Sequence, residues 1–133
     1  MTVMDGTPPE LTGSSCDELL CQQYWYAGEL ADEADVLWLK LAGKWYQLFF
    51  DAGVVHWRDQ AGEPEVRVSS EDGLLAYPLV DLAARFGLNG RVVSDTSLVE
   101  TDEGEAFSLV FDQAGTLTFV NLGDRTQIRY RRG

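Results

Sequence analysis

The fold is decided by residues 36–58, which read VLWLKLAGKWYQLFFDAGVVHWR. Two runs of alternating side chains, 36–42 and 45–50, are separated by a tight Ala-Gly turn, and a third short run follows another glycine turn. Alternation with a period of two places successive side chains on opposite faces of a strand. The stretch therefore predicts an antiparallel meander, with the leucines of the first run on the core face and Trp38 on the other.

The C-terminal third of the chain repeats this pattern. Alternating apolar residues over 107–111, 117–119 and 128–130 are separated by turns rich in Asp, Gln and Gly, which predicts a second meander. Weaker strand signals lie at 65–69 and 97–100.

Two helices are expected around these meanders. Ser15 is followed three residues later by Glu18, the spacing of a capping box, and the apolar residues beyond it favour a helix over roughly 16–27. Pro78 suits the first turn of a second helix, and Gly87 suits its end.

Length and composition fit a single folded unit. A chain of 133 residues that is 45% hydrophobic can bury a core of its own without disulfides or metals. We expect a flexible leader over residues 1–13 and one α+β domain over 14–133. That domain would hold a mostly antiparallel six- or seven-stranded sheet built from two meanders, with two helices packed on one face.

The sequence favours a reducing, cytoplasmic location. The first ten residues contain no basic residue and no apolar run, unlike a secretory signal. No stretch approaches the roughly 18 apolar residues of a membrane span. Cys16 and Cys21 lie on the expected helix at a spacing that does not suit a disulfide, so both are predicted to be free thiols.

No pattern of catalytic residues is present. The serines lack a nucleophile elbow, and two cysteines with one histidine do not make a zinc pattern. His56 is the single imidazole, and a small enzyme or ligand site around His56, Arg58 and Asp51 is a minor alternative. We therefore expect no enzyme, no cofactor and no metal.

The charge is strongly acidic and comes in blocks. The formal net charge is −12, with eight acids and no base in residues 1–35 and nine acids against two bases in 71–112. Such a surface repels phosphates and anionic lipids, so neither nucleic acid nor a membrane is an expected partner. A partner protein with a basic surface is expected instead, because complementary charge accelerates encounter.

Trp38 and Trp45 fall on the strand face opposite the leucines. If the leucine face packs on the core, these tryptophans lie outward and mark a binding surface. The alternative is that this face is also covered, by the N-terminal segment or by a second copy of the chain.

Residues 37–57, together with the small size and acidity of the chain, resemble the immunity proteins of bacterial polymorphic-toxin systems. The resemblance implies a non-enzymatic protein that binds one cognate toxin and blocks its active site. A toxin acting on nucleic acid or nucleotides has a basic cleft, which carboxylates can fill. Alternatives are a general interaction module or a homodimeric scaffold, so both monomer and homodimer stay open.

The predicted partner-binding residues are the two densest acidic runs and the two outward tryptophans. They are Asp32, Glu33, Asp35, Trp38, Trp45, Glu100, Asp102, Glu103 and Glu105.

Overall fold

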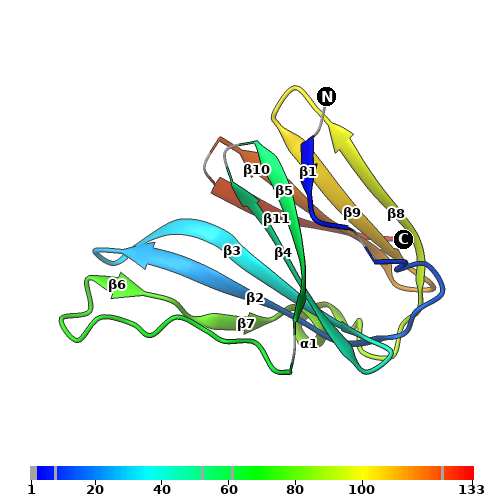
Figure 1. Ribbon diagram of the computed structural model, residues 1–133, viewed down its shortest axis with the longest axis horizontal. Helices are drawn as coiled ribbons and strands as arrows, with labels where there is room; N and C mark the ends of the chain where they lie inside the picture. Colours follow the sequence, from blue (N-terminus) through cyan, green and yellow to red (C-terminus); the bar gives the residue numbers. More distant parts are fainter. Residues whose placement is uncertain (1–2, 8, 52, 61, 124) are drawn as a thin grey trace.

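The computed structural model describes residues 3–7, 9–51, 53–60, 62–123 and 125–133, and their regular secondary structure is almost entirely β-strand (Figure 1). The elements of the first half are β1 (Val3–Asp5), β2 (Cys16–Tyr26), β3 (Glu29–Leu41), β4 (Lys44–Asp51) and β5 (Val54–Gln60). Those of the second half are β6 (Leu75–Ala76), β7 (Leu79–Asp81), α1 (Leu82–Phe86), β8 (Val93–Glu100), β9 (Glu105–Phe111), β10 (Gly115–Leu122) and β11 (Arg125–Arg132).

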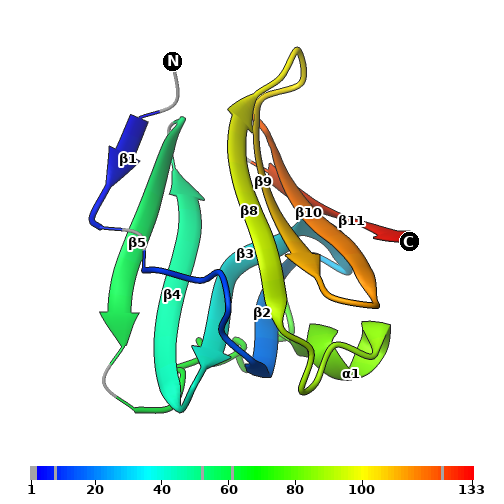
Figure 2. The ribbon, with the colours of Figure 1, turned by 90° about the vertical axis from the view of Figure 1, so that its right-hand side faces the viewer.

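The strands form two sheets that face each other (Figure 2). The first has seven strands in the order β1-β5-β4-β3-β2-β6, with β7 also paired to β2. The second has four antiparallel strands in the order β11-β10-β9-β8. Strand β1 lies parallel to β5, so the first sheet is mixed.

The core lies between the two sheets. The first sheet contributes side chains such as Leu37, Leu48 and Trp57, and the second contributes Leu109 and Phe107, all buried. The rings of Trp57 and Phe107 meet edge to face, with centroids 5.4 Å apart. Full burial of each large apolar side chain stabilises the fold by about 1.5–3 kcal/mol.

The other face of the first sheet is covered as well. Trp38 and Trp45 do point away from the leucine face, but they are only 2% and 6% exposed and form a second buried cluster with Leu20. The segment after β5 contributes to this cover, because the Arg67 amide donates to the side chain of Gln22, a buried residue of β2, at 2.8 Å. The two tryptophans are therefore not surface anchors for a partner.

The predicted α+β class is wrong, because the expected helix over 16–27 is strand β2. Leu19 and Cys21 enter the main core while Leu20 enters the cluster on the opposite face. A strand buried on both faces loses its apolar–polar alternation and imitates a helical pattern. The expected capping residue Glu18 instead forms an ion pair with Lys40 of β3, at 3.7 Å.

In place of the second expected helix, the structure contains the five-residue helix α1. Its start lies at Asp81, whose carboxylate accepts from the Ala84 amide at 2.9 Å, and not at Pro78. Gly87 ends it with a φ of 69°, as predicted. The chain is thus mostly β. None of the helices in the described ranges is long and apolar enough to cross a bilayer.

The two meanders also form separate sheets and not one sheet of six or seven strands. The weak strand signal at 65–69 does not correspond to a strand. Within the segment expected as a leader, Val3–Asp5 pairs with β5 and Leu11 is buried in the main core.

A close approach between the β8–β9 turn and strand β10 requires a glycine at Gly104. At Gly104, in the β8–β9 turn, φ is 142° and an added Cβ would clash with the backbone carbonyl oxygen of Asn121. Gly13, with a φ of 89°, has open space at the same position.

Candidate functional site: an acidic groove where two strands part

The groove exists because β3 and β4 separate. Their pairing runs from Leu41–Lys44 to Leu37–Leu48 and then ends. Beyond that point β4 continues along β5 through Asp51. Strand β3 stays with β2 but carries an irregularity, since Val36 lies opposite Gln22 and Asp32 lies opposite Tyr24. The extra residues of β3 bend it away from β4.

The bend carries β3 to the edge strand of the second sheet. The Asp32 carboxylate accepts from the Thr126 amide at 2.9 Å and from the Ala34 amide at 3.1 Å. Glu33 accepts from the Ile128 amide at 2.6 Å. Two carboxylates of β3 thus satisfy outward-pointing amides of β11, and they join the sheets through side chains.

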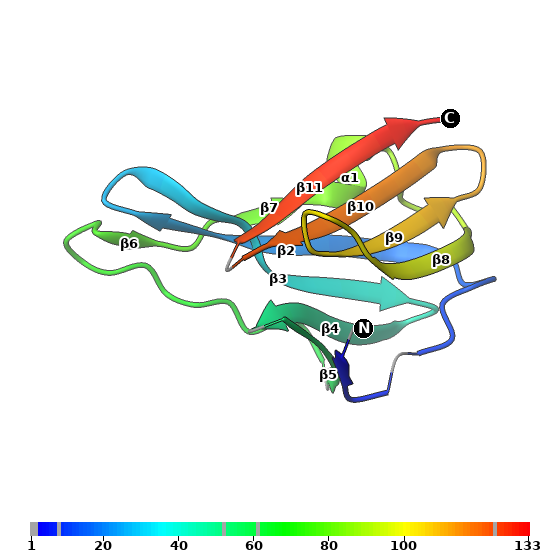
Figure 3. The same cartoon turned by 90° about the horizontal axis from the view of Figure 1, so that it is seen from above.

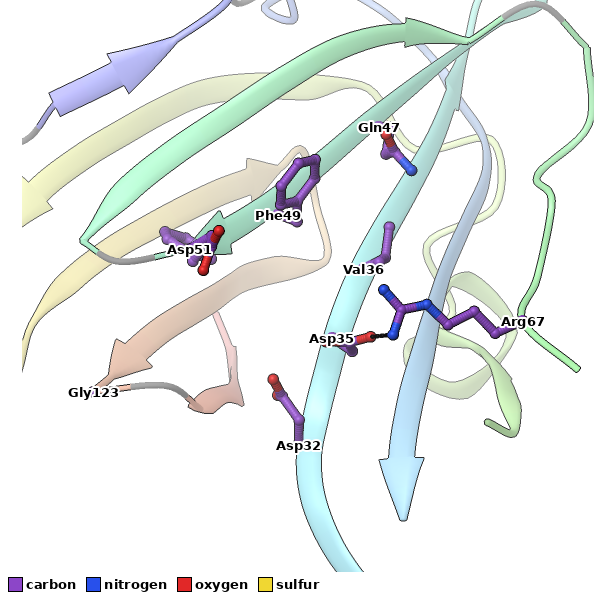
Figure 4. A pocket seen from close by; sticks show the side chains of 9 residues that line it. Asp32, Asp35, Val36, Gln47, Phe49, Asp51, Arg67 and Gly123 are labelled. Atoms are coloured by element: carbon purple, nitrogen blue, oxygen red, sulfur yellow. Dashed lines mark ion pairs between the residues drawn. The ribbon is translucent and has the colours of Figure 1, made fainter. Parts of the chain in front are cut away.

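The space between the parted strands is a groove of about 840 Å³ (Figure 4). This volume lies within the range of about 300–1,000 Å³ that is usual for ligand sites. Both strands, the 62–73 segment and the β10–β11 turn contribute to it. The lining residues are Asp32, Asp35, Val36, Gln47, Phe49, Phe50, Asp51, Arg67 and Gly123.

Three carboxylates and one guanidinium give the groove a negative balance. Arg67 reaches in from the covering segment, and its Nη1 lies 3.8 Å from Asp35 Oδ2. That carboxylate oxygen is buried and accepts no hydrogen bond from any described residue. The Arg67 side chain is 63% exposed, so the pair is a weak, solvent-screened contact.

The wall of the groove continues into a second charged cluster. The Phe49 ring stacks on His56 with centroids 4.6 Å apart. Asp5 of β1 accepts from Arg58 and lies 3.0 Å from His56 Nδ1. The hydrogen bond from Arg58, followed by that from His56, lowers the pKa of Asp5 below its ordinary value of 3.8. His56 therefore has a structural partner that anchors strand β1.

Acidic residues gather at the end of the molecule that carries the groove. We define the acidic arm as residues 22–35, at the β2–β3 hairpin, and residues 62–79, which pair with it through β6 and β7. In Figures 1 and 3 these segments lie side by side and form the end of the first sheet that projects beyond the second sheet. The arm holds eight acids and one base, a balance of −7 out of a total of −12.

The two predicted acidic runs both lie against β11. Asp32 and Glu33 contact its amides, as described above, while Glu103 forms two hydrogen bonds to Arg129 of β11, at 3.2 and 2.9 Å. Arg129 lowers the pKa of Glu103, chiefly through these bonds. Asp102 is exposed, and Glu100 lies opposite Glu105 across the β8–β9 hairpin. Part of the acid predicted to meet a partner thus also holds the fold together.

The sequence analysis did not bring Gln47, Phe49 and Arg67 into a candidate site, and it placed Asp51 only in the minor alternative around His56. Their positions on or beside regular strands gave no sign that β3 and β4 separate. A signal was present in β3 itself, because the run Asp32-Glu33-Ala34-Asp35 interrupts the alternation that resumes at Val36. An acidic interruption of that kind is typical of a bulge at a sheet edge.

The buried cysteines offer no reactive group to this site. Cys16 and Cys21 are free, as predicted, and burial raises the pKa of each thiol to about 12. No cluster of three or more metal-ligating side chains occurs within the described residues. Comparison with family models, curated proteins and solved structures gives no match.

Proposed function

We propose that this chain is a non-enzymatic inhibitor of the immunity-protein type, which binds a cognate bacterial toxin and keeps substrate out of its basic active-site cleft. The observation that carries the proposal is the charge of the acidic arm, with its eight carboxylates and one guanidinium. A cleft that holds nucleic acid or nucleotide phosphates must be basic. A concentrated acidic surface would compete for such a cleft and speed the encounter.

The shape and composition of the arm support this role. It projects beyond the second sheet, as a segment that enters a cleft must do (Figures 1 and 3). Its acids are accompanied by exposed apolar side chains, among them Tyr26 at 51% and Val68 at 88% exposure. Apolar anchors surrounded by charge are typical of protein–protein interfaces.

The alternative of a general interaction module or homodimer has less support. A dimer through the outward tryptophans needs Trp38 and Trp45 at the surface, and both are buried. The minor alternative of an enzyme around His56 is weakened because His56 lies against Asp5 and Phe49 in a cluster that anchors β1.

The first experiment identifies the partner by affinity capture from native cells and measures its association rate against salt, from about 0.05 to about 0.5 M. We expect a basic protein, bound one to one, whose activity falls to zero at equal stoichiometry. The association rate should fall steeply as salt rises.

A pair of charge-reversal variants tests which surface acts. Glu29→Lys, Glu65→Lys and Glu71→Lys together reverse three exposed acids of the arm. Asp102→Lys, Glu105→Lys and Asp112→Lys make the same charge change at and just beyond the two ends of β9. We expect at least about a tenfold slower association for the arm variant at low salt. If neither variant changes binding or protection, the acidity serves solubility alone and the proposal fails.

A further inference from the structure

We infer that the groove between β3 and β4 receives an extended, arginine- or lysine-bearing segment of the partner, which adds as a short strand to the free edge of β4. This inference rests on the proposed function and specifies its contact site.

The edge of β4 is open where the groove begins. Residues 49–51 pair with β5 on one side, and no described strand pairs with them on the other. An open edge presents unpaired amides and carbonyls, which are a template for an added strand. The opening is short, but this fold already uses additions of that length. Strand β1 adds to β5 through three residues, Val3–Asp5.

The negative charge of the groove favours basic side chains on such an added strand. Side chains from a segment along β4 would reach Asp51 at the exposed end and Asp35 on the facing strand, both of which line the groove (Figure 4). Asp35 Oδ2 is buried without a hydrogen bond among the described residues, and its cationic neighbour Arg67 stays beyond hydrogen-bonding distance at 3.8 Å. A partner guanidinium that displaced Arg67 would supply the missing donors.

The apolar wall suits the same ligand. Phe49 and Val36 line the groove beside the carboxylates. Arginine and lysine bury their aliphatic stems along such surfaces while the charged end meets a carboxylate. An aromatic ring also attracts a guanidinium over its face.

The probe is the peptide acetyl-Val-Arg-Val-Arg-Val-amide, titrated into the full chain and followed by amide chemical shifts. We expect shifts centred on residues 49–51 and Val36. Asp35→Asn with Asp51→Asn should weaken binding roughly fivefold, since each partly exposed ion pair contributes modestly. The matched control, Asp102→Asn with Asp112→Asn, removes the same charge and should change the dissociation constant less than about twofold.

Arg67→Ala tests whether the groove binds a cation or an anion. If Arg67 occupies the place of the partner cation, its removal should tighten peptide binding roughly threefold. If the groove instead holds an anion through Arg67, removal weakens binding, and the acidic peptide acetyl-Val-Glu-Val-Glu-Val-amide binds better than the basic one. Either of these two results overturns the inference.

Backbone methylation tests strand addition. Two versions of the basic peptide carry N-methyl groups on the arginines or on the central valine, which removes donors from one side of the strand or the other. One version should lose binding and the other should keep it, because a strand pairs through alternate amides. Equal binding by both rules out strand addition.

The proposed inhibition of a toxin and the proposed binding of a basic segment in this groove can be overturned by different results. A toxin complex that survives Asp35→Asn with Asp51→Asn but is lost on reversal of the exposed acids of the arm overturns the groove alone. A peptide that binds the groove when the chain has no basic partner in the cell overturns inhibition alone.

Discussion

Replacing Asp32 by alanine should measure how much the link between the sheets contributes to stability. The carboxylate accepts hydrogen bonds from the Thr126 and Ala34 amides. Thr126 is only 3% exposed, so its amide would be left without water or protein partner. A hydrogen bond to a charged acceptor contributes about 1.5–3 kcal/mol, and a buried amide left unpaired costs a similar amount.

With two such bonds, one of them partly replaceable by water, we expect Asp32→Ala to lower the free energy of unfolding by about 2–4 kcal/mol. That is a large share of the roughly 5–15 kcal/mol typical of a domain. Asp32→Asn keeps an acceptor oxygen and loses the charge, so we expect it to lower the free energy of unfolding by about 1 kcal/mol. Glu29→Ala, an exposed change on the same strand, should stay within about 0.5 kcal/mol.

The assay is urea unfolding followed by tryptophan fluorescence, with the midpoint as readout and the slope as a check that both states are unchanged. Amide hydrogen exchange at Thr126 should accelerate in Asp32→Ala and much less in Asp32→Asn. An Asp32→Ala midpoint equal to that of Glu29→Ala, with Thr126 exchange unaltered, would show that the carboxylate bonds do not hold the sheets.

Three further outcomes follow from contacts described above. Because the pKa of Asp5 is lowered in the folded state, the contribution of its carboxylate to the stability of the β1–β5 pairing is complete above pH 3.8 and is lost as the pH falls through the lower folded value. Amide exchange in β1, measured at decreasing pH, should accelerate over this range. In Asp5→Asn the same exchange should be fast already at neutral pH. Cys16 and Cys21, with pKa values raised to about 12, should react with a thiol reagent at pH 8 only after denaturant is added, so that rapid labelling of the native protein would contradict their burial. Gly104→Ala should destabilise by about 1–3 kcal/mol beyond Gly13→Ala in thermal unfolding, because both have positive φ but only the first meets a backbone oxygen; equal losses would refute the close approach.

The sequence was informative where one face of a strand is apolar and the next residue is not. Residues 36–50 alternate in this way, and β3 and β4 have the predicted turn and facing. The second meander was found for the same reason. In β2, by contrast, Leu19 and Leu20 are adjacent and both buried on opposite faces. Such a pattern can be assigned to a strand only when the segments that cover both faces of β2 are known.

The groove could not be predicted from the sequence for a different reason. Its existence depends on where β3 stops pairing with β4, and that depends on amides of β11, more than 90 residues further along the chain. The acidic run in β3 stands out in the sequence, but Asp32 and Glu33 accept hydrogen bonds from backbone amides of the chain itself. Local patterns identify strands well, whereas the end of a ladder is set by contacts distant in sequence.

The link between β3 and β11 has a consequence for how the molecules behave in concentrated solution. An edge strand with free amides can recruit the strand of a neighbouring molecule and start aggregation. Here Asp32 and Glu33 occupy amides of β11 on its open side, and their charge repels an approaching acidic copy. The two carboxylates that hold the sheets of one molecule together also keep separate molecules apart.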